Sequence, residues 1–240
     1  MLNKINSSIV FLTRNPVSAP KRLLNKIICK LRSWYYSRLI DEGNGRIIIT
    51  QPFLKFKISK GKSAHLHIIG DFRVIPHIHG DSISVIQMAN NSTLIIKGDF
   101  VIGSGVKFML ATNSLLSIGG KKNESDSGIT ADSLIMVYKK ISIGYDFLCA
   151  WNVFISDSDW HSIEGQYHQS NIEIGDHTWV ANNSSILKGS IIGANCIIAS
   201  YTKIVKKQFP NNCMIAGAPA KVVKTEIAWS RDMKPEQHKN

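Results

Sequence analysis

Apolar β-branched residues recur at strict six-residue intervals in the C-terminal half of this chain. The ladder comprises Ile174, Val180, Ile186, Ile192, Ile198 and Ile204. An α-helix repeats about every 3.6 residues and a strand about every two, so neither structure accounts for this period. A coil of short strands does, because each apolar residue then points inward at the same place on successive layers. Such a hexapeptide period predicts an all-β solenoid, specifically a parallel β-helix.

The ladder is part of a longer region with a similar alternation of short apolar runs and turn residues. Between residues 46 and 140, short β-branched runs alternate with Gly, Asn and Asp, which indicates strands joined by tight turns. Regular spacing returns at Ile143, Cys149 and Ile155, and segment 156–173 then interrupts it. We therefore predict one β-helix domain over residues 46–208, with a loop at 156–173. A C-terminal closing segment and tail follow over residues 209–240.

The first 45 residues differ from the rest in charge and periodicity. Residues 1–40 contain eight Lys or Arg and no Asp or Glu, in a chain of net charge +12. Apolar residues recur on one helical face, namely Leu23, Leu24, Ile27, Ile28, Leu31, Trp34 and Tyr35. Segment 1–45 is therefore expected to hold a basic amphipathic helix. Two interpretations stay open. The helix covers the open end of the solenoid or contacts another subunit, which we favour, or residues 20–40 lie on an anionic inner membrane.

Composition narrows the functional classes. The chain is 44% hydrophobic and 19% charged, as is typical of an ordered globular protein. No nucleic-acid-binding motif accompanies the basic residues, so we predict no nucleic-acid partner. The cysteines lie far apart and follow no convincing signal peptide; they are Cys29, Cys149, Cys196 and Cys213. We expect inert thiols in a cytoplasmic protein, peripheral at the inner membrane if the N-terminal helix binds lipid.

The interruption holds the residues best suited to catalysis. It begins Ser156-Asp157-Ser158-Asp159-Trp160-His161. Loops that leave a rigid scaffold commonly carry function, and the imidazole of His161 suits proton transfer near neutral pH. Asp157 or Asp159 could hold the second ring nitrogen. Trp160 offers a flat face to a sugar ring, and Tyr167 could help to bind an acceptor. The alternative is a polar loop without catalytic function.

Two histidine pairs lie outside this loop, His65 with His67 and His77 with His79. Residues two apart share one strand face, so each pair could ligate a metal ion. A metal site needs three or four convergent ligands, however, and the chain lacks the spaced histidine set of β-helical carbonic-anhydrase-like enzymes. We therefore predict no metal site and interpret both pairs as surface histidines.

Three segments carry a resemblance to a known family. The first runs from Ile143-Gly144 through Asn152 to the Asp157-x-Asp159-x-His161 loop. The second is IGDHTWVA at 174–181, and the third is IAGAPAKVVK at 215–224, which matches a closing Gly-x-Pro-Ala-basic signature. With these segments the chain resembles the hexapeptide-repeat acyltransferases, particularly the surface-polysaccharide O-acetyltransferases related to maltose and galactoside acetyltransferases.

The resemblance implies a left-handed coil, a homotrimer with active sites between subunits, and transfer of an acetyl group. The donor would be acetyl-coenzyme A, and the acceptor a sugar hydroxyl of a capsule, O-antigen or lipopolysaccharide. His161 matches the family's general base, Asn152 lies among the acceptor-binding positions, and no metal is required. Positions that match coenzyme contacts are Asn182, Ser200, Val205, Lys206, Lys221 and Lys224, although Val205 replaces a hydroxyl residue.

Three other functions stay open at this point. A related enzyme would N-acylate an amino sugar carried on a nucleotide, and its amide product would survive mild base. A glycosyltransferase would use Asp157 and Asp159 as a metal-binding pair. A non-catalytic β-solenoid scaffold would tolerate the loss of His161 without any functional change.

Overall fold

The computed structural model describes residues 18–77, 82–120 and 127–231. Within them, one helix, α2 (Ser18–Ser37), precedes strands β1–β23, which form three sheets. Sheet 1 contains β1 (Arg46–Ile49), β4 (Asp71–Val74), β7 (Phe100–Ile102), β10 (Gly128–Ala131), β13 (Leu148–Trp151), β16 (Trp179–Val180), β19 (Ile197–Ile198), β22 (Cys213–Ala216) and β23 (Lys221–Thr225).

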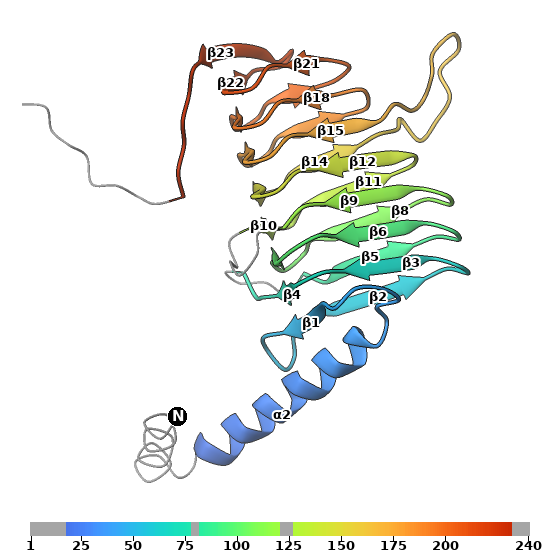
Figure 1. Cartoon of the computed structure of the whole chain (residues 1–240), viewed down its shortest axis with the longest axis vertical. Helices are drawn as coiled ribbons and strands as arrows, with labels where there is room; N and C mark the ends of the chain where they lie inside the picture. The colour runs from blue at the N-terminus through green and yellow to red at the C-terminus, as the bar shows by residue number, and fades with distance from the viewer. Residues whose placement is uncertain (1–17, 78–81, 121–126, 232–240) are drawn as a thin grey trace, which may run out of the picture.

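Sheet 2 contains β2 (Phe56–Lys60), β5 (Ser84–Met88), β8 (Lys107–Leu110), β11 (Leu134–Val137), β14 (Phe154–Ser156), β17 (Ser185–Leu187) and β20 (Lys203–Ile204). Sheet 3 contains β3 (His65–Ile68), β6 (Thr93–Ile96), β9 (Leu115–Ile118), β12 (Lys140–Ile143), β15 (Ile172–Ile174), β18 (Ile191–Ile192) and β21 (Gln208–Phe209). From β1 to β22, each strand pairs in parallel with the strand three places along, so the chain winds through the sheets in turn (Figure 1).

The strand register explains the six-residue ladder. Ile174 pairs with Ile192, and Val180 with Ile198, while Ile186 pairs with Ile204. Three six-residue steps therefore complete one turn, and every ladder residue faces the axis with at most 4% of its surface exposed. Burying such a side chain contributes about 1.5–3 kcal/mol. The predicted parallel coil of hexapeptide repeats is confirmed.

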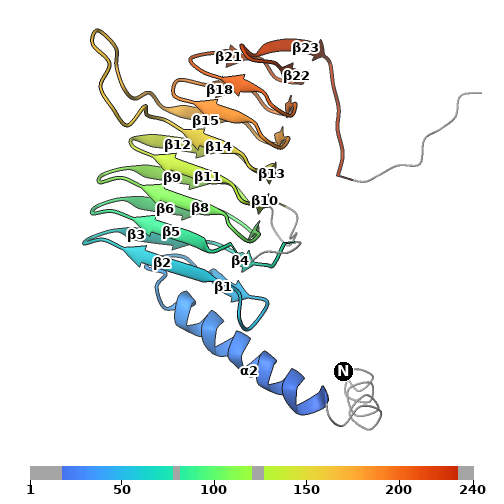
Figure 2. The same ribbon diagram turned by 180° about the vertical axis from the view of Figure 1, so that it is seen from behind.

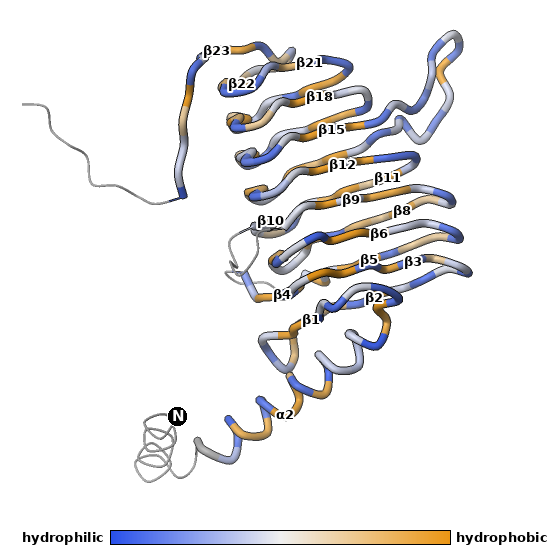
Figure 3. Tube along the Cα trace, viewed as in Figure 1, coloured by the Kyte–Doolittle hydropathy of each residue, from blue (hydrophilic) through white to orange (hydrophobic). Residues whose placement is uncertain are grey.

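The earlier turns use larger residues and longer connections. Phe72 and Phe100 lie on successive turns of sheet 1, fully buried, with ring centroids 6.3 Å apart. The hydropathy colouring in Figure 3 shows apolar strands alternating with polar corners along the whole coil. Sequence spacing is looser here because residues are inserted at the corners, while the inward-facing positions stay apolar.

Helix α2 lies at the open end of the coil and contacts it through polar side chains and through the ring of Tyr36, which packs on Phe56 at 4.8 Å between centroids. The hydroxyls of Ser33 and Ser37 accept hydrogen bonds from the amides of Ile49 and Ile47, both at 2.9 Å. The guanidinium of Arg32 donates to the carbonyls of Pro52 and Leu54, both at 2.7 Å. These bonds satisfy part of the unpaired edge of sheet 1. The favoured position is confirmed, whereas most of the apolar face is exposed. Among the described residues, no helix is long and apolar enough to cross a membrane.

The coil extends past residue 208, where the sequence placed its end. Strand β22 still pairs in parallel with β19, and β23 then folds back antiparallel to β22. Residues beyond β23 return along the coil, where the Trp229 ring stacks on His177 at 4.0 Å between centroids. His177 also bonds Asp146, so its imidazole is engaged on both sides within the coil. 

The cysteines are free thiols, and three of them lie inside the coil. Cys149, Cys196 and Cys213 are buried, and burial raises the pKa of the Cys213 thiol to about 12. Cys29, on α2, is half-buried. The three buried thiols therefore fit the inert role expected from the sequence, since the thiolate is the reactive form.

Candidate functional site

Residues 157–171 form an arm that leaves the coil between β14 of sheet 2 and β15 of sheet 3. The two legs of the arm are hydrogen-bonded to each other, Asp159 N–H to the His168 carbonyl at 2.8 Å and Ser170 N–H to the Asp157 carbonyl at 2.9 Å. Figure 2 shows the arm as the long protrusion from an otherwise even stack of turns. The break expected at 156–173 is thus a paired, projecting arm.

Asp157 anchors the arm to the preceding turn. Its carboxylate is fully buried and accepts hydrogen bonds from three consecutive backbone amides, at 2.6 Å from Tyr138, 2.8 Å from Lys139 and 2.7 Å from Lys140. These amides lie at the corner between β11 and β12, directly below the base of the arm. A carboxylate presents acceptors only, so it can satisfy all three donors at once.

We expect Asp157→Asn to destabilise the folded protein by about 1–3 kcal/mol, because an amide turns an N–H toward one of the three donors and leaves it unsatisfied. Urea unfolding followed by circular dichroism measures the change. Glu164→Gln, an exposed substitution on the same arm, serves as the matched control. Equal stability of Asp157→Asn and the control would contradict the anchoring role.

Lys188 anchors the arm from the following turn. Its ammonium group, on a side chain only 4% exposed, bonds the Asp159 carboxylate and the Tyr167 carbonyl, the latter at 2.8 Å. Lys188 follows β17, and Ser156 pairs with Leu187, so the ammonium lies just above the arm base. A buried ammonium needs such partners, since an unpaired one is strongly unfavourable. Lys188 is not among the site residues predicted from the sequence. The feature that could have indicated it is a single lysine within the hexapeptide repeats of the first turn after the break.

An aromatic cluster fixes the backbone next to His161. The Tyr138 ring packs edge-on against Trp160 at 5.6 Å and His168 at 4.8 Å, between centroids. Trp160 donates from its indole nitrogen to the Ser156 hydroxyl at 3.1 Å and has a φ of +62°. A left-handed backbone at a bulky residue is strained and is held by its surroundings. Trp160 is half-buried, so only part of its ring is open to a sugar.

The imidazole of His161 is exposed beside this cluster and forms no hydrogen bond within the described part of the chain. This corrects the expectation that Asp157 or Asp159 holds its ring. The physical reason is competition: three backbone amides engage Asp157, and the Lys188 ammonium engages Asp159. The same contacts remove the support for a metal-binding pair of aspartates. The side chain of Tyr167, which is 90% exposed, projects from the far leg of the arm.

The remaining predicted site residues occupy two corners of the coil and strand β23. Asn152, Asn182 and Ser200 lie between sheets 1 and 2, and the Ser200 hydroxyl donates to the Asn182 amide oxygen at 2.7 Å. Val205 and Lys206 lie between sheets 2 and 3, where the Lys206 amide donates to the Lys188 carbonyl at 3.0 Å. Lys221 and Lys224 are exposed on β23. One chain thus brings Lys206 near the arm, while Asn182 and Ser200 are on a different corner.

Of the two histidine pairs outside the arm, only His65 and His67 lie wholly within the described residues. His65 and His67 share the outer face of β3, and His67 lies 3.7 Å from Glu42. His79 lies outside the described residues. In the parts of the chain that the structure covers, no three His, Cys, Asp or Glu side chains converge.

Comparison with known proteins gives matches over most of the chain. The family described as bacterial transferase hexapeptide (six repeats) matches residues 171–206. A polysialic acid O-acetyltransferase of Neisseria meningitidis is 37% identical over 150 residues, which are 60% of this chain and 67% of that protein. A 24.8 kDa protein encoded in the cps region of Klebsiella pneumoniae is 30% identical over 199 residues, 80% of this chain and 84% of that protein.

Other matches are more partial. The polysialic acid O-acetyltransferase of Escherichia coli O1:K1 is 29% identical over 147 residues, and the match spans only 44% of its length. Among solved structures, a polysialic acid O-acetyltransferase has a TM-score of 0.47 at 27% identity, covering 83% of this chain and 93% of the other. Galactoside acetyltransferase with coenzyme A has a TM-score of 0.48 at 21% identity, covering 59% and 72% of the two chains.

Proposed function

This chain belongs to the hexapeptide-repeat acyltransferases, and from that premise we propose that it transfers acetyl from acetyl-coenzyme A to a sugar hydroxyl of a bacterial surface polysaccharide. The observation that carries the proposal is the projecting arm. Its root is anchored to the coil, and it presents the imidazole of His161 to solvent in a chain that belongs to this family. The same membership supports a left-handed sense for the coil.

The names of the relatives support the acceptor class. The relatives from Neisseria meningitidis and Escherichia coli O1:K1 are polysialic acid O-acetyltransferases, and the Klebsiella protein is encoded in a cps region. All three descriptions concern surface polysaccharides or their gene regions. A sugar hydroxyl in a polymer is therefore the acceptor that we assign to this chain, ahead of a nucleotide-linked amino sugar.

His161 would act as the general base. Its ring is free to accept the proton of an acceptor hydroxyl as that oxygen attacks the acetyl carbonyl, and a positioned base typically contributes about 10²–10⁴-fold to rate. The half-buried Trp160 beside it, with Tyr167 and Asn152, would contact the acceptor. Asp159 would position the arm through Lys188, and Asp157 through the backbone of the preceding turn.

Exposed cations suit the phosphates of the donor. Lys206, Lys221 and Lys224 are exposed near the end of the coil, and within the described residues none of them forms an ion pair. Such ammonium groups would bind phosphate as point charges. The Asn182–Ser200 corner would meet the amide groups of the pantetheine arm, and Val205, on the other corner of the coil, would offer the coenzyme an apolar contact. Acetyl-coenzyme A supplies the activated acetyl group when it is bound.

A complete site would need more than one copy of the chain. His161 projects from the corner between sheets 2 and 3, whereas Asn182 and Ser200 lie between sheets 1 and 2. A homotrimer would place the first corner of one copy against the second corner of its neighbour. We propose that this trimer acts in the cytoplasm, where acetyl-coenzyme A is available.

Transfer of labelled acetate from acetyl-coenzyme A tests the proposal. The purified 240-residue chain is incubated with polysialic acid and with de-O-acetylated capsule and lipopolysaccharide polymers. We expect incorporation with at least one polymer, release of one free thiol per acetate, and loss of the label in mild base. A base-stable label on an amino sugar nucleotide would instead indicate N-acylation. Absence of both transfer and coenzyme binding would indicate a scaffold.

A further inference from the structure

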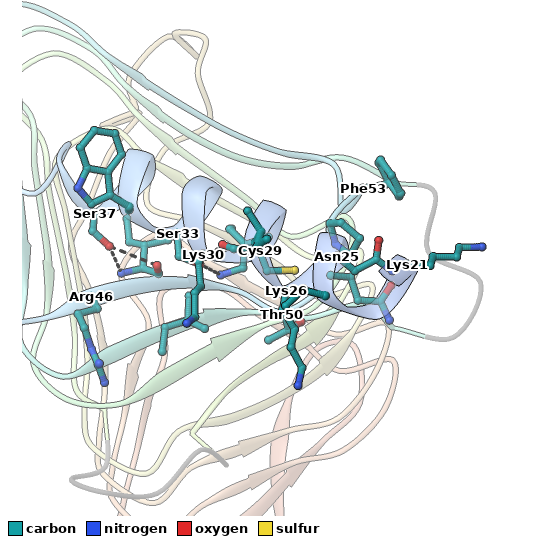
Figure 4. Close-up of a pocket in the computed structure, with 18 residues that line it drawn as sticks. Lys21, Asn25, Lys26, Cys29, Lys30, Ser33, Ser37, Arg46, Thr50 and Phe53 are labelled. Atoms are coloured by element: carbon teal, nitrogen blue, oxygen red, sulfur yellow. Dashed lines mark hydrogen bonds between the residues drawn. The ribbon is translucent and has the colours of Figure 1, made fainter. Parts of the chain in front are cut away.

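We propose that the outward face of α2 binds the surface of an anionic lipid bilayer. The helix is amphipathic, yet the side that docks on the coil carries polar side chains and the ring of Tyr36, which packs on Phe56, and not the row of exposed apolar residues. Ser33, Ser37 and Arg32 make the hydrogen bonds to β1 and the turn after it, as Figure 4 shows for the two serines that point toward the strand. This orientation leaves most of the apolar side of α2 exposed, and three of its residues, Leu23, Ile27 and Trp34, border the open groove beside β1.

The outward face is apolar and wide. Leu23, Leu31, Trp34 and Tyr35 are each about 60% exposed, at 61%, 60%, 60% and 58%, and Leu24 and Ile27 lie between them. Figure 3 shows apolar segments recurring along α2, which extends beyond the stack of turns. A row of six large apolar side chains is unusual on a surface that faces only water. Leu and Ile side chains enter the acyl region, while Trp and Tyr prefer the headgroup level.

Positively charged side chains flank this face, and their charge favours an anionic surface as the binding partner. Lys26 and Lys30 lie along one side of the apolar row, Lys21 lies on the other, and Arg38 stacks over Trp34 at 4.9 Å. No Asp or Glu occurs anywhere in residues 1–40. The three lysines form no ion pair in the part of the chain described by the structure. An apolar stripe edged by lysines is the pattern of an interfacial helix on anionic lipid.

The groove between α2 and β1 also suits the binding of lipid headgroups. It has a volume of about 1120 Å³ and is lined by Lys21, Lys26 and Lys30 together with Ile27 and the strand residue Ile48. Phosphate headgroups carry the charge that these ammonium groups attract. Because α2 extends from the β1 end of the coil, the bilayer would lie at the end opposite β23 (Figure 1).

Vesicle sedimentation tests the inference with the whole 240-residue chain. Vesicles of phosphatidylcholine containing 30% phosphatidylglycerol should bind the protein, vesicles of phosphatidylcholine alone should not, and added salt should weaken the binding. Leu31→Ser combined with Trp34→Ser should weaken binding at least tenfold. Lys26→Ser combined with Lys30→Ser should weaken it by a similar factor, since each cation contributes roughly fivefold.

The altered side chains are exposed, so we expect the variants to fold, and circular dichroism checks this. Tyr145→Ser, which removes an exposed aromatic ring on the coil 51% open to solvent, is the matched control and should bind like the parent. Equal vesicle binding by all variants, or no binding to the anionic vesicles, would overturn the inference. So would loss of oligomer mass in the α2 variants in the absence of lipid, because the face would then be a subunit contact.

Discussion

Replacing His161 by alanine is expected to reduce acetyl transfer severely while leaving the folded protein intact. The side chain is exposed and has no hydrogen-bond partner among the described residues, so its removal breaks no structural contact. If His161 is the general base, the acceptor hydroxyl in the alanine variant must attack the acetyl carbonyl without a group that accepts its proton. We expect kcat/KM to fall by about 10²–10⁴-fold.

Three measurements make this result specific. Thermal unfolding and oligomer mass should match the parent, and coenzyme binding by calorimetry should be unchanged. His65→Ala removes another exposed imidazole, from β3, and should keep full activity. Retained turnover in His161→Ala would remove His161 from the catalytic role, while the acyltransferase assignment would then need a different base on the arm.

Replacing Lys188 by methionine should reduce kcat/KM by about a hundredfold, although Lys188 is not expected to contact substrate. The ammonium holds both legs of the arm, through Asp159 on one leg and the Tyr167 carbonyl on the other. Without it, the Asp159 carboxylate, already a third exposed at 33%, turns to water and the arm loses its upper anchor. A displacement of about 1 Å at a catalytic group can reduce rate by about 10².

A double-mutant cycle distinguishes a role of Lys188 in positioning the arm from a direct effect of its charge on the substrate. If Lys188 acts by holding Asp159, then Asp159→Asn should show much of the same loss, and the double variant should add little to Lys188→Met. Limited cleavage after Glu164, on the arm, should become faster in each of these variants. Independent, additive losses without faster cleavage would mean that Lys188 acts on the substrate directly and not through the arm.

Much of the coil could be predicted from the sequence, because its determinants are local. A period of six fixes which residue points inward at each step, and Ile174, Ile192 and their neighbours pair as that period requires. The break at 156–173 could be recognised for the same reason. A segment without inward-facing apolar residues at this spacing cannot form a turn of the coil, so it projects from the surface. The imidazole of His161 could be selected within it on chemistry alone.

The partners of the arm residues could not be predicted in this way. Asp157 meets the amides of residues 138–140, and Asp159 meets Lys188, which lie one turn below and one turn above the arm. Their positions depend on the stacking of whole turns, including inserted residues at other corners. The adjacent sequence suggested that Asp157 or Asp159 bonds His161, because that imidazole is the nearest partner along the chain.

The sequence by itself determined the coil, the place where it opens and the residue that suits catalysis. It also determined that α2 is amphipathic and basic, since spacing and charge are properties of the chain. Only the tertiary structure decided which face of α2 meets the coil, because the open edge of β1 presents backbone amides that polar side chains satisfy and apolar ones cannot. The same demand for hydrogen-bond partners drew Asp157 into the coil and left the ring of His161 free.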